Sequence, residues 1–155
     1  MQGAVHDELY AAMDWLTERQ PQIEQPLACR HLKDGELALY DVSCSYFEGR
    51  TSPLARFGYD HGKGKRGRMQ VAYGLLCDSD GRPVAIECFE GSLKDSKTLF
   101  VQVEKIQKRF GLCRAIVVTD RGIGTQENVT LLSNPDLVLT TTPRAGRGVG
   151  MSGWA

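Results

Sequence analysis

Two apolar runs of this chain each end in an aspartate. Asp41 ends L-A-L-Y-D, and Asp120 ends A-I-V-V-T-D. A carboxylate at the point where a hydrophobic strand leaves the core is costly unless something pairs with it. Two such carboxylates on neighbouring strands make a natural seat for Mg²⁺, which prefers hard oxygen ligands. The two runs therefore favour a fold in which these strand ends converge.

The composition is that of one globular domain, and the overall charge does not indicate a particular partner. The 155 residues are 41% hydrophobic and 25% charged, which allows a real core. The 19 basic and 19 acidic residues cancel, so a nucleic-acid footprint must be local. No apolar run approaches the roughly 18 residues of a membrane span, and the N-terminus lacks the pattern of a signal peptide.

The five cysteines form no C-x-x-C pair, which indicates reduced thiols rather than disulfides or a zinc site. Most of them lie inside apolar, strand-like runs, so we expect buried thiols. The five are Cys29, Cys44, Cys77, Cys88 and Cys113.

Hydrophobic spacing and turn residues predict the elements of the first half. An amphipathic helix is predicted from about Val5 to Arg19, and Pro21 and Pro26 make its continuation unlikely on physical grounds. A strand is predicted from Leu37 to Ser43. A long loop rich in Gly, Arg and Lys follows, at about 49–68.

A hairpin and a helix are predicted next. The strand Met69–Asp78, a tight turn at Ser79–Arg82 and a return strand at 83–90 form the hairpin. The helix is predicted from Ser96 to Phe110, with Asp95 or Ser96 as its cap and Gly111 as its stop. Its apolar face is Leu99, Val103, Ile106 and Phe110.

The last part reads as a short central strand, Ala115–Asp120, a helix near 125–132 and a strand near 137–141. The Gly-rich tail, 143–155, is expected to be disordered. Three successive strands followed by alternating helices predict an α/β fold with a mixed sheet and helices packed on it.

Several spaced blocks resemble bacterial insertion-sequence transposases of the DDE type. The first is L-Y-D-V-S-C-S-Y-F-E-G-R-T-S-P-L-A-R-F-G-Y-D, and the second is Q-V-A-Y-G-L-L-C-D-S-D-G-R-P-V-A-I-E-C-F-E-G-S-L-K-D-S-K-T-L. The third is A-I-V-V-T-D-R-G-I-G-T-Q-E-N, and the helix D-E-L-Y-A-A-M-D-W-L is also similar. The resemblance covers roughly His6 to Leu132.

This resemblance implies an RNase H-like fold in which the strands of Asp41 and Asp120 are neighbours. It implies that both aspartates are catalytic, as the first two members of the acidic triad, and that both are metal ligands for Mg²⁺ or Mn²⁺. The activity implied is DNA cleavage and strand transfer in transposition, in the bacterial cytoplasm, with a homo-oligomer left open. Two metal ions on either side of a phosphorus neutralise charge and activate the attacking oxygen.

The third member of the triad, a glutamate beside Tyr and Arg on a later helix, has no match after Asp120. The only later acidic residues, Glu127 and Asp136, come too early. We therefore expect a truncated core with weak metal binding and little or no activity. The expected division is a helical segment at 1–36, a partial RNase H-like core at 37–142, incomplete at its C-terminus, and the tail.

A basic segment, H-G-K-G-K-R-G-R, is the candidate DNA contact, because its glycines let the backbone approach phosphates. The alternative is a solvated loop. Together with the arginine that follows Asp120, the candidate DNA-binding residues are Lys63, Lys65, Arg66, Arg68 and Arg121.

Other functions stay open at this stage. Asp41 alone could pair with a nearby cation, and Asp120 alone could serve as a turn residue. One rival is a DNA-binding or interaction remnant without chemistry, and another is a metal-dependent nuclease that uses Glu87 or Glu90 as a substitute third carboxylate. The tail sequence G-R-G-V-G has no helix after it, so no nucleotide cofactor is expected.

Overall fold

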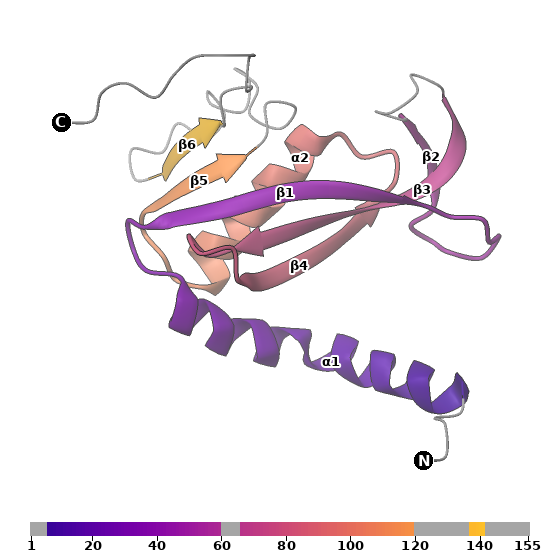
Figure 1. The fold of residues 1–155 in the computed structure, drawn as a ribbon, viewed down its shortest axis with the longest axis horizontal. Coiled ribbons are helices and arrows are strands. Elements are labelled where there is room, and N and C mark those ends of the chain that lie inside the picture. The colour runs from indigo at the N-terminus through magenta and orange to yellow at the C-terminus, as the bar shows by residue number, and fades with distance from the viewer. Residues whose placement is uncertain (1–5, 60–65, 120–136, 142–155) are drawn as a thin grey trace.

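The computed structural model describes residues 6–59, 66–119 and 137–141, which form a mixed sheet with helices (Figure 1). The elements in chain order are α1 (His6–His31), β1 (Leu37–Tyr46), β2 (Arg56–Tyr59), β3 (Arg66–Cys77), β4 (Pro83–Glu90), α2 (Asp95–Glu104), the π-helical turn η1 (Lys105–Arg109), β5 (Ala115–Thr119) and β6 (Leu137–Thr141). The predicted α/β class with a mixed sheet is confirmed. The predicted helix near 125–132 and the tail at 143–155 lie outside the described residues.

The sheet has the order β2-β3-β1-β5-β6, and β4 also pairs with β3. β3 is antiparallel to β1, β2 and β4, whereas β5 is parallel to both β1 and β6. The chain therefore builds outward from one side of β1 through β3 and β4. It then returns through α2 to the other side of β1, where β5 and β6 follow.

One face of the sheet is covered by helices and carries the core. Side chains of β1, β3, β4 and β5 form one core with those of α2, η1 and the C-terminal part of α1. Figure 1 shows the ribbons of α1 and α2 against the sheet. The apolar face predicted for the helix is confirmed, since its four members are all nearly inaccessible to solvent. They are Leu99, Val103, Ile106 and Phe110. Gly111 ends this helical segment with a positive φ of 73°.

Tyr40 fills the middle of this core because it faces a glycine. Its side chain lies over Gly74 of β3, where a Cβ atom would come within 2.2 Å of the tyrosine Oη. Tyr40 is 2% exposed. The glycine therefore makes the space that a large aromatic ring needs directly above a neighbouring strand.

The sequence-based prediction that the prolines end α1 is wrong, because the helix continues through Pro21 and Pro26 to His31. Polar contacts of the helix with β4 explain the difference. Gln20 Nε2 donates to the carbonyl of Ile86 at 2.7 Å, and the amide of Ile86 donates to Glu24 Oε1 at 3.1 Å. Tertiary contacts thus stabilise the helical conformation of a segment whose intrinsic helix propensity is low.

These contacts also protect an exposed sheet edge. β4 pairs with β3 on one side only, so the backbone groups on its other side have no strand partner among the described residues. Side chains of α1 form hydrogen bonds with the backbone carbonyl and amide of Ile86 instead. These contacts satisfy the edge at Ile86, where another strand could otherwise pair.

Two strand predictions need correction. β1 does not end at Ser43 but continues to Tyr46, because its pairing with β3 continues to the Tyr46–Gln70 pair. The predicted loop at 49–68 contains β2, whose four residues are too few to show a hydrophobic alternation. The hairpin with its turn after Asp78 and the strand at 137–141 agree with the predictions.

Gln70 lies where β3 changes its partner along one edge from β2 to β4. Its side chain is buried, and its Nε2 donates to the carbonyl of Gly91 at 2.9 Å. A Cβ atom at Gly58 would come within 1.9 Å of Gln70 Nε2, and one at Gly91 within 1.9 Å of the Gln70 carbonyl oxygen. Gly58 therefore makes room for the side chain of Gln70, and Gly91 makes room for its backbone.

Two local predictions also fail. The cysteines are not buried: Cys77 is half-buried, and the other four are exposed, because they lie on outward-facing positions of strands, helix and loop. The cap of α2 is Lys94 rather than Asp95 or Ser96, and it makes no side-chain capping hydrogen bond. No described helix combines the length and the apolar character needed to cross a membrane.

Candidate functional site

Asp41 lies inside β1, at the point where the strand loses one of its neighbours. On one side it pairs with Leu75 of β3. On the other side the register with β5 runs from the Leu37–Ile116 pair to the Leu39–Val118 pair. Asp41 is two residues beyond that last pair, so it is not at the end of its strand but just past the pairing of β1 with β5.

The side chain of Asp41 points away from the core. Residues alternate between the two faces of a strand, and Tyr40 and Val42, on either side of Asp41, face the helices. Asp41 is exposed, and the described residues offer it no hydrogen bond or ion pair. Among residues 6–59, 66–119 and 137–141, no cation pairs with this carboxylate, which lies on the sheet face opposite the core.

Cys77, opposite Leu39 in the strand beside β1, has a thiol whose pKa is raised. Burial is the largest cause of this rise, followed by the charge of Asp78 and then by the charge of Asp41.

Most of the other predicted site residues lie outside the described residues. Asp120 is the residue after β5, whose last residue is Thr119. Those outside the described residues are Asp120, Arg121, Lys63 and Lys65. Arg66 is the first residue of β3, and only its backbone is described.

Arg68 is exposed and stacks on an aromatic ring. Its guanidinium lies 5.0 Å from the ring centroid of Tyr46, which is itself 49% exposed. Tyr46 and Arg68 come from the paired ends of β1 and β3. Sequence reasoning did not select Tyr46; its place next to a basic segment in space depends on the long pairing of β1 with β3.

The two glutamates considered as substitutes do not meet Asp41. Glu87 pairs with Gly74 of β3, as Val42 of β1 does, so it shares the helix-covered face. It forms an ion pair with Lys105 at 2.6 Å. Glu90 pairs with Arg56 at 3.2 Å and lies opposite Val71, roughly 13 Å along the strands from the level of Asp41.

A second charged cluster was not foreseen, and it is buried. Glu24 is 3% exposed, and its Oε2 accepts from Lys105 Nζ at 3.4 Å and from Arg109 Nη1 at 2.9 Å. Two anions, Glu24 and Glu87, thus face two cations. Gln20, four residues earlier, also donates to Glu24, but the backbone and cationic partners of Glu24 lie 62 to 85 residues further along the chain, beyond any local sequence signal.

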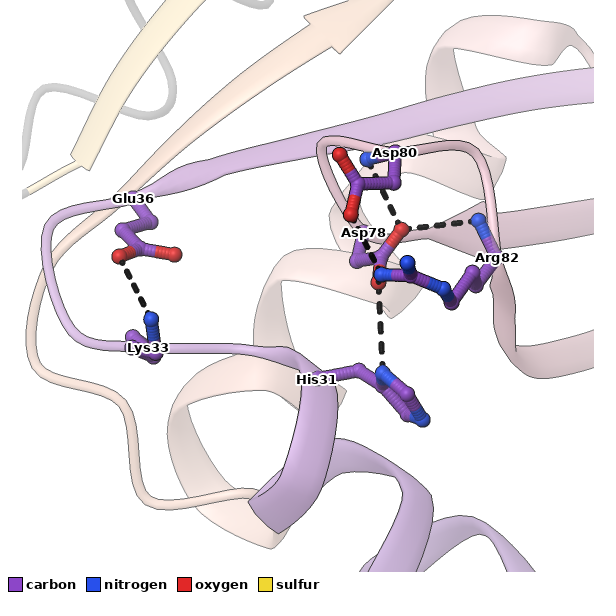
Figure 2. A network of polar contacts seen from close by, with 6 residues as sticks. All are labelled: His31, Lys33, Glu36, Asp78, Asp80 and Arg82. Carbon is purple, nitrogen blue, oxygen red and sulfur yellow. Dashed lines mark hydrogen bonds and ion pairs between the residues drawn. The ribbon is translucent and has the colours of Figure 1, made fainter.

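A third cluster joins the β3–β4 turn to the end of α1 (Figure 2). Asp78 Oδ1 accepts from the amides of Asp80 at 3.0 Å and Arg82 at 2.8 Å. Its Oδ2 lies 3.3 Å from Arg82 Nη1 and 3.4 Å from His31 Nδ1. Lys33 and Glu36 pair at 3.3 Å in the connection that follows the helix.

Burial is the largest single influence on the pKa of Asp78, and it raises that pKa. The hydrogen bonds from the amide and guanidinium of Arg82 and from the amide of Asp80 together outweigh burial, so the pKa is lowered overall. The carboxylate is therefore fully paired inside the protein. This cluster fixes the turn and leaves no open ligand position for a cation.

Among residues 6–59, 66–119 and 137–141, no three His, Cys, Asp or Glu side chains are placed to hold a metal ion together. Asp41 supplies one hard oxygen ligand, and a metal site here depends on residues beyond this set. Asp41 and Arg68 are predicted site residues whose side chains are described. Asp41 lies towards one end of the β1–β3 pairing, and Arg68 lies just beyond its other end.

Two solved transposase structures are similar in fold to this chain. One is piggyBac transposase in a synaptic complex with hairpin DNA, at 14% identity and a TM-score of 0.48, matched over 74% of this chain and 24% of that one. The other is Mos1 transposase in a paired-end complex with the left transposon end, at 12% identity and a TM-score of 0.40, matched over 79% of this chain and 42% of that one. This chain thus spans less than half of either protein. No protein-family model matches the sequence, and no curated protein is significantly similar to it.

Proposed function

We propose that this chain is the RNase H-like core of a bacterial DDE transposase, acting on DNA in the cytoplasm. In this proposal Asp41 and Asp120 are metal ligands for Mg²⁺ or Mn²⁺ and catalytic residues for phosphoryl transfer. The observation that carries it is the arrangement of β1 and β5. The two strands are adjacent and parallel, and each apolar run leads into one of the aspartates.

The sheet order gives β1 and β5 a special position. The chain leaves β1 towards β3 and β4 on one side, and it returns to β5 on the other side. In open α/β sheets, ligands bind where the chain direction switches in this way, and Asp41 lies just past the last residue pair of β1 with β5. Antiparallel β1, β3 and β4 with parallel β5 and β6 is also the strand arrangement expected of an RNase H-like sheet.

The chemistry of Asp41 fits the proposed metal. It is an exposed carboxylate, and the described residues leave it without a neutralising cation. Mg²⁺ keeps several waters and takes few carboxylates from the protein, so an accessible aspartate suits it. When bound, the metal would neutralise phosphate charge and activate the attacking oxygen.

The basic residues would bind the DNA backbone. Arg68 lies in β3, Lys63, Lys65 and Arg66 precede it in the sequence, and Arg121 follows Asp120. Cations at these positions would contact phosphates and add a salt-dependent term to the affinity. They would orient a strand of DNA without reading its sequence.

The proposal includes weak catalytic activity. Only two of the three acidic residues of a DDE site have a match in this sequence, and neither Glu87 nor Glu90 approaches Asp41. Removing one member of a cooperative site costs orders of magnitude in rate. We therefore expect metal binding that is measurable and DNA cleavage that is slight or absent.

Binding of Mn²⁺, followed by the electron paramagnetic resonance signal of free Mn²⁺, tests the proposal. Asp41→Asn and Asp120→Asn should each weaken binding at least tenfold. Glu90→Gln is the control, because it removes an exposed carboxylate from the same sheet face, and it should leave binding unchanged. Binding that survives Asp41→Asn, or that Glu90→Gln abolishes, would overturn the assignment.

A second candidate is a DNA-binding protein without catalysis, favoured by the exposed pair of Tyr46 and Arg68. A guanidinium that lies over a half-exposed aromatic ring suits contact with phosphate and base together. DNA binding that weakens with salt and with Arg68→Ala, in a protein that binds no Mn²⁺, would support this function over the first. Cleavage of supercoiled DNA that depends on Mg²⁺ and on Asp41 would support the first.

A further inference from the structure

The last residue pair of β1 with β3 presents an aromatic ring at the surface. Tyr46 lies opposite Gln70 in this pair, and it is 49% exposed. The amide of Phe47 donates to the carbonyl of Met69 at 2.8 Å, so the hydrogen bonds between the two segments continue one step beyond Tyr46. The backbone that carries the ring is therefore held on both sides, although the ring is not part of the hydrophobic core.

Arg68 meets this ring from an irregular part of β3. The pairing of β2 with β3 shifts between Phe57 and Tyr59, where β3 has two residues between the pairs and β2 has one. Arg68 is one of these two, and the other is a glycine. A bulge of this kind re-aims a side chain, and bulges are concentrated at sheet edges and beside functional sites. Here the guanidinium of Arg68 lies 5.0 Å from the centroid of the Tyr46 ring.

The charge of Arg68 differs from that of other arginines that lie over rings. Arg19 and Arg109 also lie over aromatic rings, and each forms an ion pair with a glutamate of α1. Arg68 forms no ion pair with any side chain that the structure describes. The ring of Tyr46 attracts the guanidinium but does not neutralise it, so the positive charge stays available to an anionic ligand.

A cation beside a half-exposed ring matches the two parts of one nucleotide, a phosphate anion and a flat base. Cations can bind the phosphates of single-stranded and of duplex DNA alike. In a duplex, however, the neighbours in the stack cover both faces of each base, so a protein ring stacks on a base only where that base is unpaired or terminal. The presence of the ring therefore favours DNA with unpaired bases.

We infer that Tyr46 and Arg68 form a binding site for an unpaired nucleotide of single-stranded DNA, with the base stacked on Tyr46 and its phosphate paired with Arg68. The inference rests on the proposed function, in which DNA is the ligand, and adds the form of DNA that is bound. Tyr46 is five residues beyond Asp41 in β1, about 17 Å at 3.4 Å per residue. The site would therefore hold a nucleotide to one side of a phosphate that reacts at Asp41.

The test compares three labelled DNA ligands of about twelve residues by fluorescence anisotropy, with the full chain and in EDTA. They are single-stranded oligothymidine, a strand of abasic residues that has the same phosphates but no bases, and a duplex. Stacking of one base contributes roughly five- to 150-fold in affinity. Tyr46→Ala should therefore weaken binding of oligothymidine at least fivefold and leave binding of the abasic strand and of the duplex within twofold. Because an unfolded variant would lose all three ligands, the abasic strand also controls for folding.

Two further variants separate the ring from its surroundings. Tyr46→Phe keeps the ring and should bind oligothymidine within twofold of the unaltered protein. Phe57→Ala is the matched control, because it removes another exposed aromatic ring, 68% exposed, from the neighbouring strand β2, and it should change binding less than twofold. Arg68→Gln should weaken binding of oligothymidine and of the abasic strand alike, and it should lower the slope of log affinity against log salt by about 0.7.

Several outcomes would overturn the inference. One is a loss with Tyr46→Ala that is equal for oligothymidine and the abasic strand, and another is an equal loss for the single strand and the duplex, which would make duplex DNA the ligand. A Tyr46→Phe variant as weak as Tyr46→Ala would do the same. EDTA keeps these results separate from the Mn²⁺ titration. A protein that binds Mn²⁺ through Asp41 but prefers no strand with bases would refute this inference and leave the metal assignment standing.

Discussion

Asp41 lies in β1, and Asp78 directly follows β3, which pairs with β1. The surroundings of the two carboxylates are nevertheless opposite. Asp78 follows β3 and is 3% exposed, with donors from a turn, an arginine and a histidine around it. Asp41 is exposed, and the described residues give it no donor. A fully paired carboxylate stabilises the fold, whereas one without donors is suited to a ligand.

The lowered pKa of Asp78 makes its contribution to stability dependent on pH. Because the folded pKa is lower than the unfolded value of about 3.9, the contribution is complete above that value and is lost as pH falls through the folded pKa. Asp78→Asn should therefore lower the urea midpoint at pH 7, and the difference from the unaltered protein should shrink below about pH 4. Asp80→Asn, in the same turn but exposed, should have little effect. A difference that stays constant from pH 7 to pH 2 would contradict this role.

At the scale of elements, α1 is fastened to the sheet by charge as well as by apolar contact. Glu24 Oε2 forms ion pairs with Lys105 and Arg109 of η1. Its Oε1 accepts a hydrogen bond from the amide of Ile86 in β4. The π-helical turn is marked by the hydrogen bond from the Phe110 amide to the Lys105 carbonyl at 3.1 Å. Three elements therefore meet at a single buried carboxylate.

Glu24→Gln tests this fastening. The variant keeps the shape of the side chain but leaves the cations of η1 short of one buried anion, so we expect a loss of about 3 kcal/mol in the free energy of unfolding. Glu18→Gln makes the same change in an exposed pair with Arg19 and should cost less than about 1 kcal/mol. Urea unfolding measures both. Equal losses would mean that the buried cluster does not fasten the helix.

The sequence predicts those elements that local patterns define. The periodicity of Leu99 and Ile106, and the turn at Gly81, need only neighbouring residues, and the structure agrees with both. The continuation of α1 through Pro21 was missed, because contacts with Ile86 and Lys105 override a local propensity. The candidate site was predicted only in part for the same reason: the apolar run before Asp41 is visible, but the extension of β1 beyond it depends on pairing with β3.

In the described part of the molecule, the hydrophobic core lies on one side of the sheet. Leu76 of β3 is 0% exposed beneath the helices, while its neighbour Leu75 points to the other face and is 39% exposed. Ile86, which pairs with Leu75, is 44% exposed on that same face. The open face therefore contributes much less burial to the stability of the described part than the covered face does.

This asymmetry can be measured with two adjacent, identical residues. Leu76→Ala should lower the free energy of unfolding by about 3 kcal/mol through lost burial and a cavity, and Leu75→Ala by about 1 kcal/mol. Urea unfolding of both variants gives the comparison directly. Equal losses would mean that something covers the open face in solution.

The position of Glu24 early in the chain has a consequence for biosynthesis. At roughly 5–20 residues per second, Arg109 is made several seconds after Glu24, so α1 leaves the ribosome well before its docking site exists. Pro21 and Pro26 lower the tendency of this segment to become helical during that interval. Although α1 precedes the other described elements in the chain, it can therefore form its buried ion pairs only after η1 has been made.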